Sequence, residues 1–200
     1  RGVGAVILNP LLNAQLLEDI EQDRKIAEAD ERMLLLRLRK VCLVLYYAPQ
    51  ALDRGRIAWE AKLWNMISLM MKERKNKWKC KIAMGDSNAQ VQRRDAVTRT
   101  IGPCGPEKGS AAGKRIARKL DELNLVLLNS YSDWGEDRTT FKGFVNAETN
   151  QKYGETEIDH VFCQGRFKKN WISLEKQPTG DEYQHNRLVA KFSIDSFEAV

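Results

Sequence analysis

Two polar side chains at the end of an apolar run are the strongest candidates for chemistry in this chain. Asp86 and Asn88 follow the run Ile82-Ala83-Met84 and the glycine at position 85. In a strand, the period of two points both side chains the same way at the edge of a sheet. A carboxylate beside an amide can position a water molecule and hold a phosphate oxygen. The same residue types also form turns, so a plain strand-to-loop turn is the alternative interpretation.

Asp159 and His185 supply the remaining chemistry, and each lies next to an apolar run, as Asp86 does. Strand ends of this kind can meet at one rim of a sheet. A carboxylate next to a histidine orients the imidazole and stabilises its protonated form. A second carboxylate can bind a divalent metal or activate water. Phosphodiester hydrolysis needs these parts.

Each of these residues also has a simpler interpretation. Asp159 could pair with a lysine or arginine, and His185 could be a surface histidine. Tyr47, which ends another apolar run, could be a tyrosine at the rim of the core. His160 alternates away from Asp159 along its strand and is expected to pack on the other face. The prediction of a site therefore rests on the set and its order, not on any one member.

Hydrophobic periodicity predicts the elements that position these residues. Apolar runs predict strands at residues 2–8, 33–38, 41–47, 79–84, 125–128, 157–162 and 188–194, with a strand-like piece beginning at Thr139. Residues 33–47 are expected to form a hairpin, and a polar hairpin is expected at residues 146–154. Residues 16–30 are highly charged and are expected to be a peripheral insertion. Residues 90–110, rich in glycine and proline, are expected to form a long loop.

Two helices are predicted between the strands. In residues 57–72, one apolar face is expected to consist of Ile57, Ala61, Trp64, Ile67 and Met71, widened by Leu63 and Met70. In residues 113–123, leucine and isoleucine side chains recur at helical spacing, and Asn124 is expected to end the helix. Many strands with two intervening helices predict an α/β or α+β layered fold.

Composition sets broad limits on the function. The 200 residues, 42% hydrophobic and 30% charged, are typical of one globular domain, and no stretch is apolar enough to span a membrane. The net charge of +6 weakly favours an acidic partner such as nucleic acid. No C-x-x-C pair occurs among the four cysteines, which are expected to be reduced in an intracellular protein, and a zinc site is not expected.

The segment from Gly109 to Arg115 superficially matches a phosphate-binding loop, but nucleotide binding there is rejected. Its spacer is one residue short, Arg115 stands where serine or threonine would bind magnesium, and no buried strand precedes it. Lys108, Lys114 and Arg115 could instead touch a nucleic-acid backbone, and a solvated helix entrance is the alternative.

Five motifs in order resemble the endonuclease/exonuclease/phosphatase family, which includes DNase I and the apurinic/apyrimidinic endonucleases. The likeness is strongest to endonuclease domains of LINE-type non-LTR retrotransposons and the craniofacial-development-protein-2-like sequences derived from them. The motifs are Leu45-Tyr46-Tyr47-Ala48-Pro49, Gly85-Asp86-Ser87-Asn88-Ala89, the loop, helix and strand of residues 102–129, Glu157-Ile158-Asp159-His160-Val161, and residues 184–192 with His185. Together they cover almost the whole chain.

The resemblance implies a four-layer α/β sandwich of the DNase I-like type, with two packed sheets flanked by helices. It implies that Asp86 orients or activates the attacking water and that Asn88 holds the phosphate or that water. It also implies that His185 contacts the scissile phosphate, that Asp159 orients His185, and that Tyr47 donates to a phosphate oxygen or the leaving group. Asn129, Thr140 and Phe141 would lie along the substrate groove. Mg²⁺ or Mn²⁺ would be the cofactor.

The sequence also departs from the family pattern. An asparagine and a metal-binding glutamate that precede the position of Arg1 in the family are absent, so the chain is expected to be one N-terminally truncated domain over residues 1–200. Gln184 replaces the aspartate before the histidine, and Tyr183 replaces a serine. The metal ligands therefore stay unassigned, and a chain without the glutamate is expected to cleave weakly or not at all.

Three hypotheses follow from the resemblance. The first is a magnesium-dependent, DNA-nicking endonuclease of retrotransposon origin, intracellular and nuclear, with a reverse transcriptase in the parent chain. The second is a catalytically degenerate domain that binds nucleic acid or protein, which the loss of a carboxylate at Gln184 favours. The third is a phosphatase of the same family, which the basic charge and the retrotransposon-like middle region disfavour.

Overall fold

The computed structural model describes residues 32–37, 41–50, 52–72, 80–94, 99–145, 152–165, 168, 171–180 and 183–192. The predicted strand at residues 2–8 and the charged segment at residues 16–30 lie outside these ranges. No helix in the described part of the chain is both long and apolar enough to cross a membrane.

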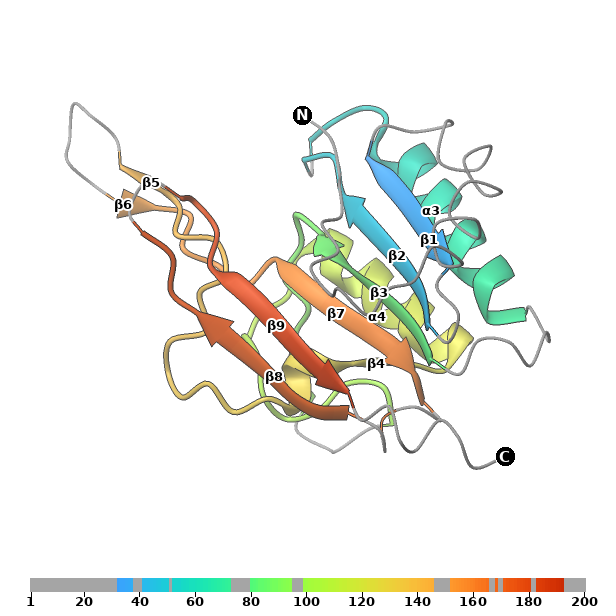
Figure 1. The fold of residues 1–200 in the computed structure, drawn as a ribbon. Helices are drawn as coiled ribbons and strands as arrows, with labels where there is room; N and C mark the ends of the chain where they lie inside the picture. Colours follow the sequence, from blue (N-terminus) through green and yellow to red (C-terminus); the bar gives the residue numbers. More distant parts are fainter. Residues whose placement is uncertain are drawn as a thin grey trace, which may run out of the picture.

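A five-stranded sheet forms the centre of the molecule, with strand order β1-β2-β3-β7-β4 (Figure 1). The strands are β1 (Met33–Arg37), β2 (Val41–Tyr47), β3 (Cys80–Asp86), β4 (Leu125–Leu127) and β7 (Asp159–Gln164). The predicted hairpin is confirmed, because β1 pairs with β2 in antiparallel fashion. Strand β2 runs parallel to β3, and β7 lies antiparallel between β3 and β4. This order brings the last residue of β3 next to the first residue of β7.

Helices α3 (Arg56–Lys72) and α4 (Ala111–Leu123) lie on the same face of the sheet (Figure 1). Both predicted helices are confirmed. Ser110 caps the start of α4 by accepting a hydrogen bond from Gly113 N, and Asn124 ends it in the left-handed conformation. The predicted apolar face of α3 is partly wrong, because Ile57 is 60% exposed and Ala61 is exposed as well. The buried face is instead Arg56, Trp59, Glu60, Leu63, Trp64, Ile67 and Met70.

A second, two-stranded sheet packs on the opposite face of the central sheet. It consists of β8 (Trp171–Gln177) and β9 (Arg187–Phe192), and only β9 was expected from the sequence. A short helical turn, η1 (Leu128–Tyr131), follows β4, and the hairpin β5 (Phe144–Val145) with β6 (Lys152–Tyr153) extends away from the body (Figure 1). The expected strand from Thr139 is reduced to isolated bridges at Phe141.

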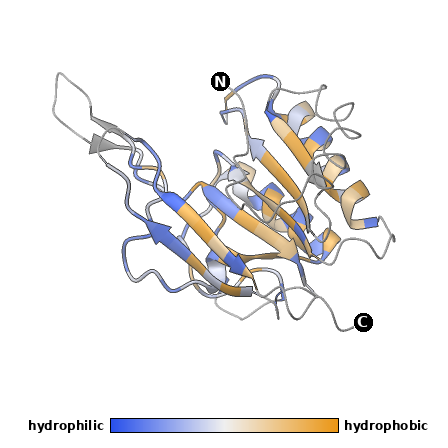
Figure 2. Ribbon diagram, viewed as in Figure 1, coloured by the Kyte–Doolittle hydropathy of each residue, from blue (hydrophilic) through white to orange (hydrophobic). Residues whose placement is uncertain are grey.

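The central sheet separates two apolar clusters. One lies between the sheet and the helices, where Ile67, Leu120 and Phe162 are almost fully buried. The other lies between the sheet and β8–β9, around Val161 and Leu174. Hydropathy shows the same arrangement, with apolar strand centres and hydrophilic starts of β7 and β9 (Figure 2). The polar strand ends thus lie at the rim, where the candidate site forms.

Candidate active site

Asp86, Asp159 and His185 converge at one rim of the central sheet. Asp86 is the last residue of β3 and Asp159 the first of β7, and the two are direct partners in the antiparallel register. Partners in such a ladder point to the same face of the sheet. His185 Nδ1 lies 2.9 Å from Asp159 Oδ2, and its Nε2 lies 3.9 Å from Asp86 Oδ2. The expectation that these three strand ends share one rim is confirmed.

The segment before β9 carries His185 to this rim through backbone contacts with residues 140–142. Lys142 N donates to Gln184 O over 2.8 Å, and Asn186 N donates to Thr140 O over 2.8 Å. The ring of Phe141 lies 5.1 Å from the His185 ring, centroid to centroid. The imidazole is therefore held from one side by an aromatic ring and from another by Asp159.

Asn88 lies in a turn at this rim. Strand β3 ends at Asp86, and Asn88 has a φ of 43°, so the period of two does not continue to it. Asn88 N donates to Asp86 Oδ1 over 2.7 Å, and its side-chain Nδ2 donates to Ala48 O over 2.7 Å. The turn and the site are thus the same feature: the turn fixes one oxygen of the Asp86 carboxylate and leaves the other toward His185.

Gly85 allows β3 to approach β2 closely just before the site. A Cβ at this position would lie 1.9 Å from the backbone oxygen of Tyr46, which is far inside van der Waals contact. Any larger residue would push the end of β3, and with it Asp86, away from β2.

Thr140 and Asn129, which were expected along a substrate groove, instead hydrogen-bond the backbone around Asp159. Thr140 is fully buried, and its Oγ1 accepts hydrogen bonds from Ile158 N and Asp159 N. Asn129 is also fully buried; its Nδ2 donates to Asp159 O, and its Oδ1 accepts from Val161 N, both over 2.9 Å. Both side chains use their polar atoms on the β7 backbone. Phe141, the third expected groove residue, is half-buried beside His185.

Tyr47 and Gln184 also lie near the rim. Tyr47 is the register partner of Asp86 on the parallel strand β2, and its half-buried ring packs under the guanidinium of Arg32, 5.6 Å away. Gln184 is exposed, and its backbone oxygen accepts the bond from Lys142 that positions the His185 segment. The expected role of Tyr47 in substrate contact stays a prediction.

The pKa values of Asp86 and His185 are both raised, which suits the carboxylate to accept a proton and the imidazole to carry one. Burial, reinforced by the nearby Asp159 carboxylate, raises the pKa of Asp86 to about 6. The hydrogen bond to Asp159 raises the pKa of His185 above its ordinary value. Near neutral pH, Asp86 is thus a carboxylate able to accept a proton, beside an imidazole biased toward its protonated form.

Buried networks beneath the rim were not predicted from the sequence. Ser87 Oγ lies 2.8 Å from Tyr46 Oη and 3.0 Å from His160 Nδ1, which confirms that His160 packs on the face away from Asp159. On the same, helix-covered side of the sheet, Arg115 donates to Glu60 over 2.7 and 2.9 Å. Arg115 is therefore engaged in an ion pair, whereas it was considered as a nucleic-acid contact. The spacing of Arg56 and Glu60 on α3 was the one local signal for this network.

The same three residues fit a divalent metal. Among the described residues, ligand atoms of Asp86, Asp159 and His185 all lie within 4.8 Å of one another. Carboxylate oxygens are the ligands that both Mg²⁺ and Mn²⁺ prefer, and the cluster offers two carboxylates. The donor set therefore fits either ion.

Comparison with known proteins gives a fold but no family. No protein-family model matches the chain, and no curated protein matches its sequence. Among solved structures, the chain is similar to the 3′ phosphatase NExo from Neisseria bound to product DNA hairpin (TM-score 0.57, 15% identity, 82% of this chain and 66% of that one). It is also similar to the endonuclease domain of TRAS1, a telomere-specific non-LTR retrotransposon (TM-score 0.55, 18% identity, 81% and 64%). An AP endonuclease from Archaeoglobus fulgidus gives a TM-score of 0.57 at 14% identity, over 84% and 67%.

The chain has the DNase I-like fold. This confirms the α/β fold class expected from the resemblance. The chain spans about two thirds of the length of these neighbours. At identities of 14 to 18%, the likeness concerns the fold, and the activity has to be argued from the rim itself.

Proposed function

We propose that this chain is a metal-dependent phosphodiesterase that nicks DNA. The observation that carries the proposal is the convergence of Asp86, Asp159 and His185 at one rim, with the imidazole bonded to one carboxylate and close to the other. Two carboxylates and an oriented imidazole are what attack on a phosphodiester requires. The neighbours with this fold include nucleases and a 3′ phosphatase, which supports hydrolysis at phosphate.

In the proposed reaction, Asp86 accepts the proton of the attacking water. Its Oδ2 atom is the one available, since Oδ1 is held by Asn88 N, and it lies 3.9 Å from His185 Nε2. The water oxygen bonds to phosphorus as the P–O bond to the leaving oxygen breaks, and the leaving oxygen takes a proton from Tyr47 or solvent. His185, protonated and oriented by Asp159, donates a hydrogen bond to an oxygen of the scissile phosphate. Asn88, in the turn after β3, and Tyr47, the register partner of Asp86 on β2, are proposed to complete the contacts to the phosphate.

The carboxylates of Asp86 and Asp159 would hold the metal, because a protonated His185 has no lone pair to offer it; the metal would neutralise charge on the phosphate and is proposed to be Mg²⁺ or Mn²⁺. DNA is the proposed substrate. The net charge of +6 suits a polyanion, and the similar NExo structure is bound to a product DNA hairpin.

We also propose a retrotransposon origin, with a reverse transcriptase in the parent chain and action in the nucleus. The sequence motifs resemble LINE-type endonuclease domains and craniofacial-development-protein-2-like sequences, and one structural neighbour is a retrotransposon endonuclease domain.

A second candidate is a catalytically degenerate module of the same fold that binds nucleic acid. The observation that favours it is Gln184, a neutral, exposed side chain directly before His185 where the resemblance has an aspartate. Loss of that carboxylate removes negative charge that would help to bind or tune a metal.

Relaxation of supercoiled plasmid by the 200-residue chain tests the proposal. With Mg²⁺ or Mn²⁺ and protein in excess over DNA, nicked circles should accumulate over a long incubation. Asp86→Ala and His185→Ala should each lower the nicking rate by about 10²- to 10⁴-fold, as loss of a proton-transfer group does. Asp133→Ala, which removes an exposed carboxylate elsewhere, is the control and should cut like the wild type.

The possible outcomes separate the candidates. Nicking that persists in both variants would contradict the assigned site. No nicking by the wild-type chain with either metal, while plasmid binding persists in a gel-shift assay, would favour the binding module.

A further inference from the structure

Arg56 is a buried guanidinium at the edge of the sheet that carries the site. It is the first residue of α3 and only 2% exposed. Its Nε donates to Glu60 Oε1 over 2.5 Å, one Nη donates to Pro49 O, and the other donates to Ser87 O over 2.7 Å. A buried charge is costly unless its donors are satisfied, and here the planar fork reaches one carboxylate and two backbone carbonyls.

The two carbonyls belong to the segments that end β2 and β3. Pro49 follows β2, and Ser87 lies between Asp86 and Asn88. The same two segments are joined directly: Ala48 N donates to Asp86 O over 2.8 Å, and Asn88 Nδ2 donates to Ala48 O over 2.7 Å. Arg56 therefore holds both segments from the helix side, opposite the face that Asp86 presents to His185.

Glu60 fixes the guanidinium in turn. It is 6% exposed and accepts from Arg56 as well as from Arg115 of α4. The Arg115 side chain is 36% exposed, and two of its nitrogens donate to Glu60. Arg56 and Arg115 thus share one carboxylate, but Arg56 is the one that also reaches the strand-end segments. This difference makes the pair a matched test.

We propose that Arg56 is a positioning residue: its guanidinium locks the Ser87–Asn88 turn against the end of β2 and so sets the placement of Asp86 and Asn88. The consequence for catalysis rests on the function proposed above. The placement itself does not, because it can be observed in the absence of substrate. A residue that only stabilised the fold would loosen the whole sheet when replaced, whereas a positioning residue loosens the turn.

Amide hydrogen exchange measured by NMR distinguishes these cases. Arg56→Met keeps an unbranched side chain but removes all the donors, and Arg56→Lys keeps the charge while replacing the fork by one ammonium group. Exchange at the amides of Ala48, Ser87 and Asn88 should rise at least tenfold in Arg56→Met and less in Arg56→Lys. The central ladder amides of Ala83 and Phe162, which are register partners, should stay within about twofold of wild type.

Arg115→Met is the control. It removes a guanidinium from the same carboxylate and should leave exchange in the turn within about twofold of wild type. An equal rise at Ala83 and in the turn, or the same rise in Arg115→Met, would overturn the proposal. If Arg56→Met does not fold, the comparison is made between Arg56→Lys and Arg115→Lys: exchange in the turn should rise more in Arg56→Lys, and an equal rise in both would overturn the proposal.

Kinetics then tests the consequence for the reaction. In a chain that nicks DNA, Arg56→Met should lower kcat at least tenfold while KM changes less than about threefold. The kcat of Arg56→Lys should lie between those of Arg56→Met and the wild type. The kcat of Arg115→Met should stay within about threefold of the wild type. Unchanged kcat despite faster exchange would refute the catalytic consequence. A wild-type chain that does not cleave refutes the proposed function, and the exchange data still decide the placement of the turn.

Discussion

The buried histidine beneath the rim should make stability depend on pH in a way that one substitution removes. His160 is 1% exposed and lies 3.0 Å from Ser87 Oγ through its Nδ1. Burial lowers the pKa of His160 from the ordinary 6.5 to about 4; the Asp159 charge opposes this shift and the Arg138 charge adds to it. His160→Asn is the informative variant, because its amide can take the place of Nδ1 but does not titrate.

The sign follows from the lowered pKa. Below about pH 6.5 the unfolded chain binds a proton at His160, whereas the folded chain stays neutral until about pH 4. The folded state therefore has its full advantage above pH 6.5 and loses it as the pH falls toward 4. At 1.36 kcal/mol per pKa unit, the whole gap is worth about 3 kcal/mol. Between pH 7.5 and pH 5, the same linkage gives a loss of about 2 kcal/mol.

Asp86 acts in the opposite direction over the same range. Its pKa is raised to about 6, so the folded chain gains a proton before the unfolded chain does, and stability rises as the pH falls from 6 toward 3.8. The pH profile of the wild type alone therefore partly conceals the histidine. The difference between wild type and His160→Asn removes the contribution of Asp86, which both chains share.

Urea unfolding in EDTA, followed by circular dichroism at pH 7.5, 6.25 and 5, measures this difference. The free energy of unfolding of His160→Asn, relative to wild type, should improve by about 2 kcal/mol between pH 7.5 and pH 5. Parallel profiles for the two chains, or a relative loss in the variant at low pH, would refute the reasoning. Direct titration of the His160 ring by NMR gives an independent reading of the same pKa.

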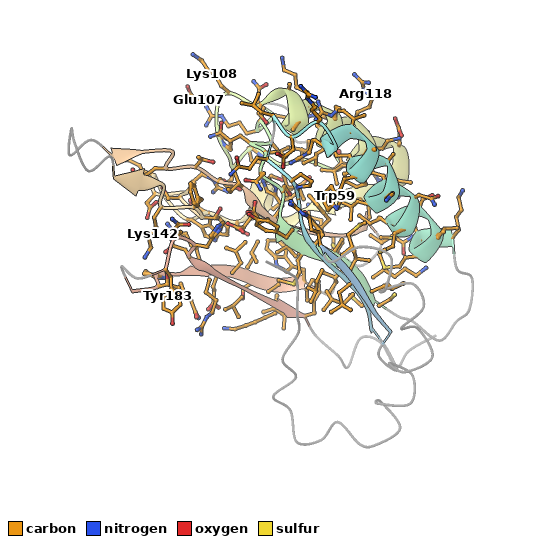
Figure 3. All side chains as sticks on the ribbon, turned by 90° about the horizontal axis from the view of Figure 1, so that it is seen from above. Trp59, Glu107, Lys108, Arg118, Lys142 and Tyr183 are labelled. Atoms are coloured by element: carbon orange, nitrogen blue, oxygen red, sulfur yellow. The ribbon has the colours of Figure 1, made fainter. Side chains whose placement is uncertain are left out.

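Two further predictions concern the support of β7 and the binding of DNA. Asn129→Leu removes the hydrogen-bond partners of two backbone groups of β7 and should lower the free energy of unfolding, measured with urea, by about 3 kcal/mol. The control Asn65→Leu, at an exposed position, should change the free energy of unfolding by less than about 0.5 kcal/mol. Lys114 and Arg118 line a surface hollow of about 380 Å³ beside α4, and Arg118 points outward with Lys108 on the side away from Tyr183 (Figure 3). The double change Lys114→Gln with Arg118→Gln should weaken binding of a plasmid fragment and reduce the slope of log affinity against log salt concentration by about 1 to 2. The control Lys119→Gln, which removes a lysine paired with Glu122, should change that slope little. Equal slopes for the double variant and the wild type would exclude this face from DNA contact.

Much of the architecture could be predicted because apolar runs and helix-ending residues are local features of the sequence. Apolar runs of β2 and β3 located the strands almost to the residue, and Asn124 marked the end of α4, whereas the cap at Ser110 was found only in the structure. The apolar face of α3 was harder, because the helix is apolar on several sides and carries a buried ion pair. Ile57 was expected in the core but is exposed, while Arg56, which lay outside the predicted helix, is buried. Helical periodicity alone does not report which carboxylate or carbonyl will accept from a guanidinium.

Asn129 and Thr140 show the same limit at the candidate site. Their residue types suit substrate contact as well as backbone support, and the choice depends on whether β7 or the rim lies within reach. In the fold, the β7 backbone takes their polar atoms, and both are fully buried. Strand β8 was not predicted because its charged residues interrupt the alternation of apolar and polar side chains that marks a strand. Its backbone is extended because it pairs with β9.

The sequence by itself determined which groups are available for chemistry and that strand ends carry them: a carboxylate and an amide after β3, a carboxylate at the start of β7, and a histidine before β9. Side-chain type and the period of a strand are local properties, so a sequence expresses them directly. Only the tertiary structure decided that Asp86 and Asp159 are register partners and that His185 bonds one of them. Those distances depend on strand order, on the turn that Arg56 contacts, and on the backbone at the start of β7 that Asn129 and Thr140 bond. These are contacts between residues far apart in the chain.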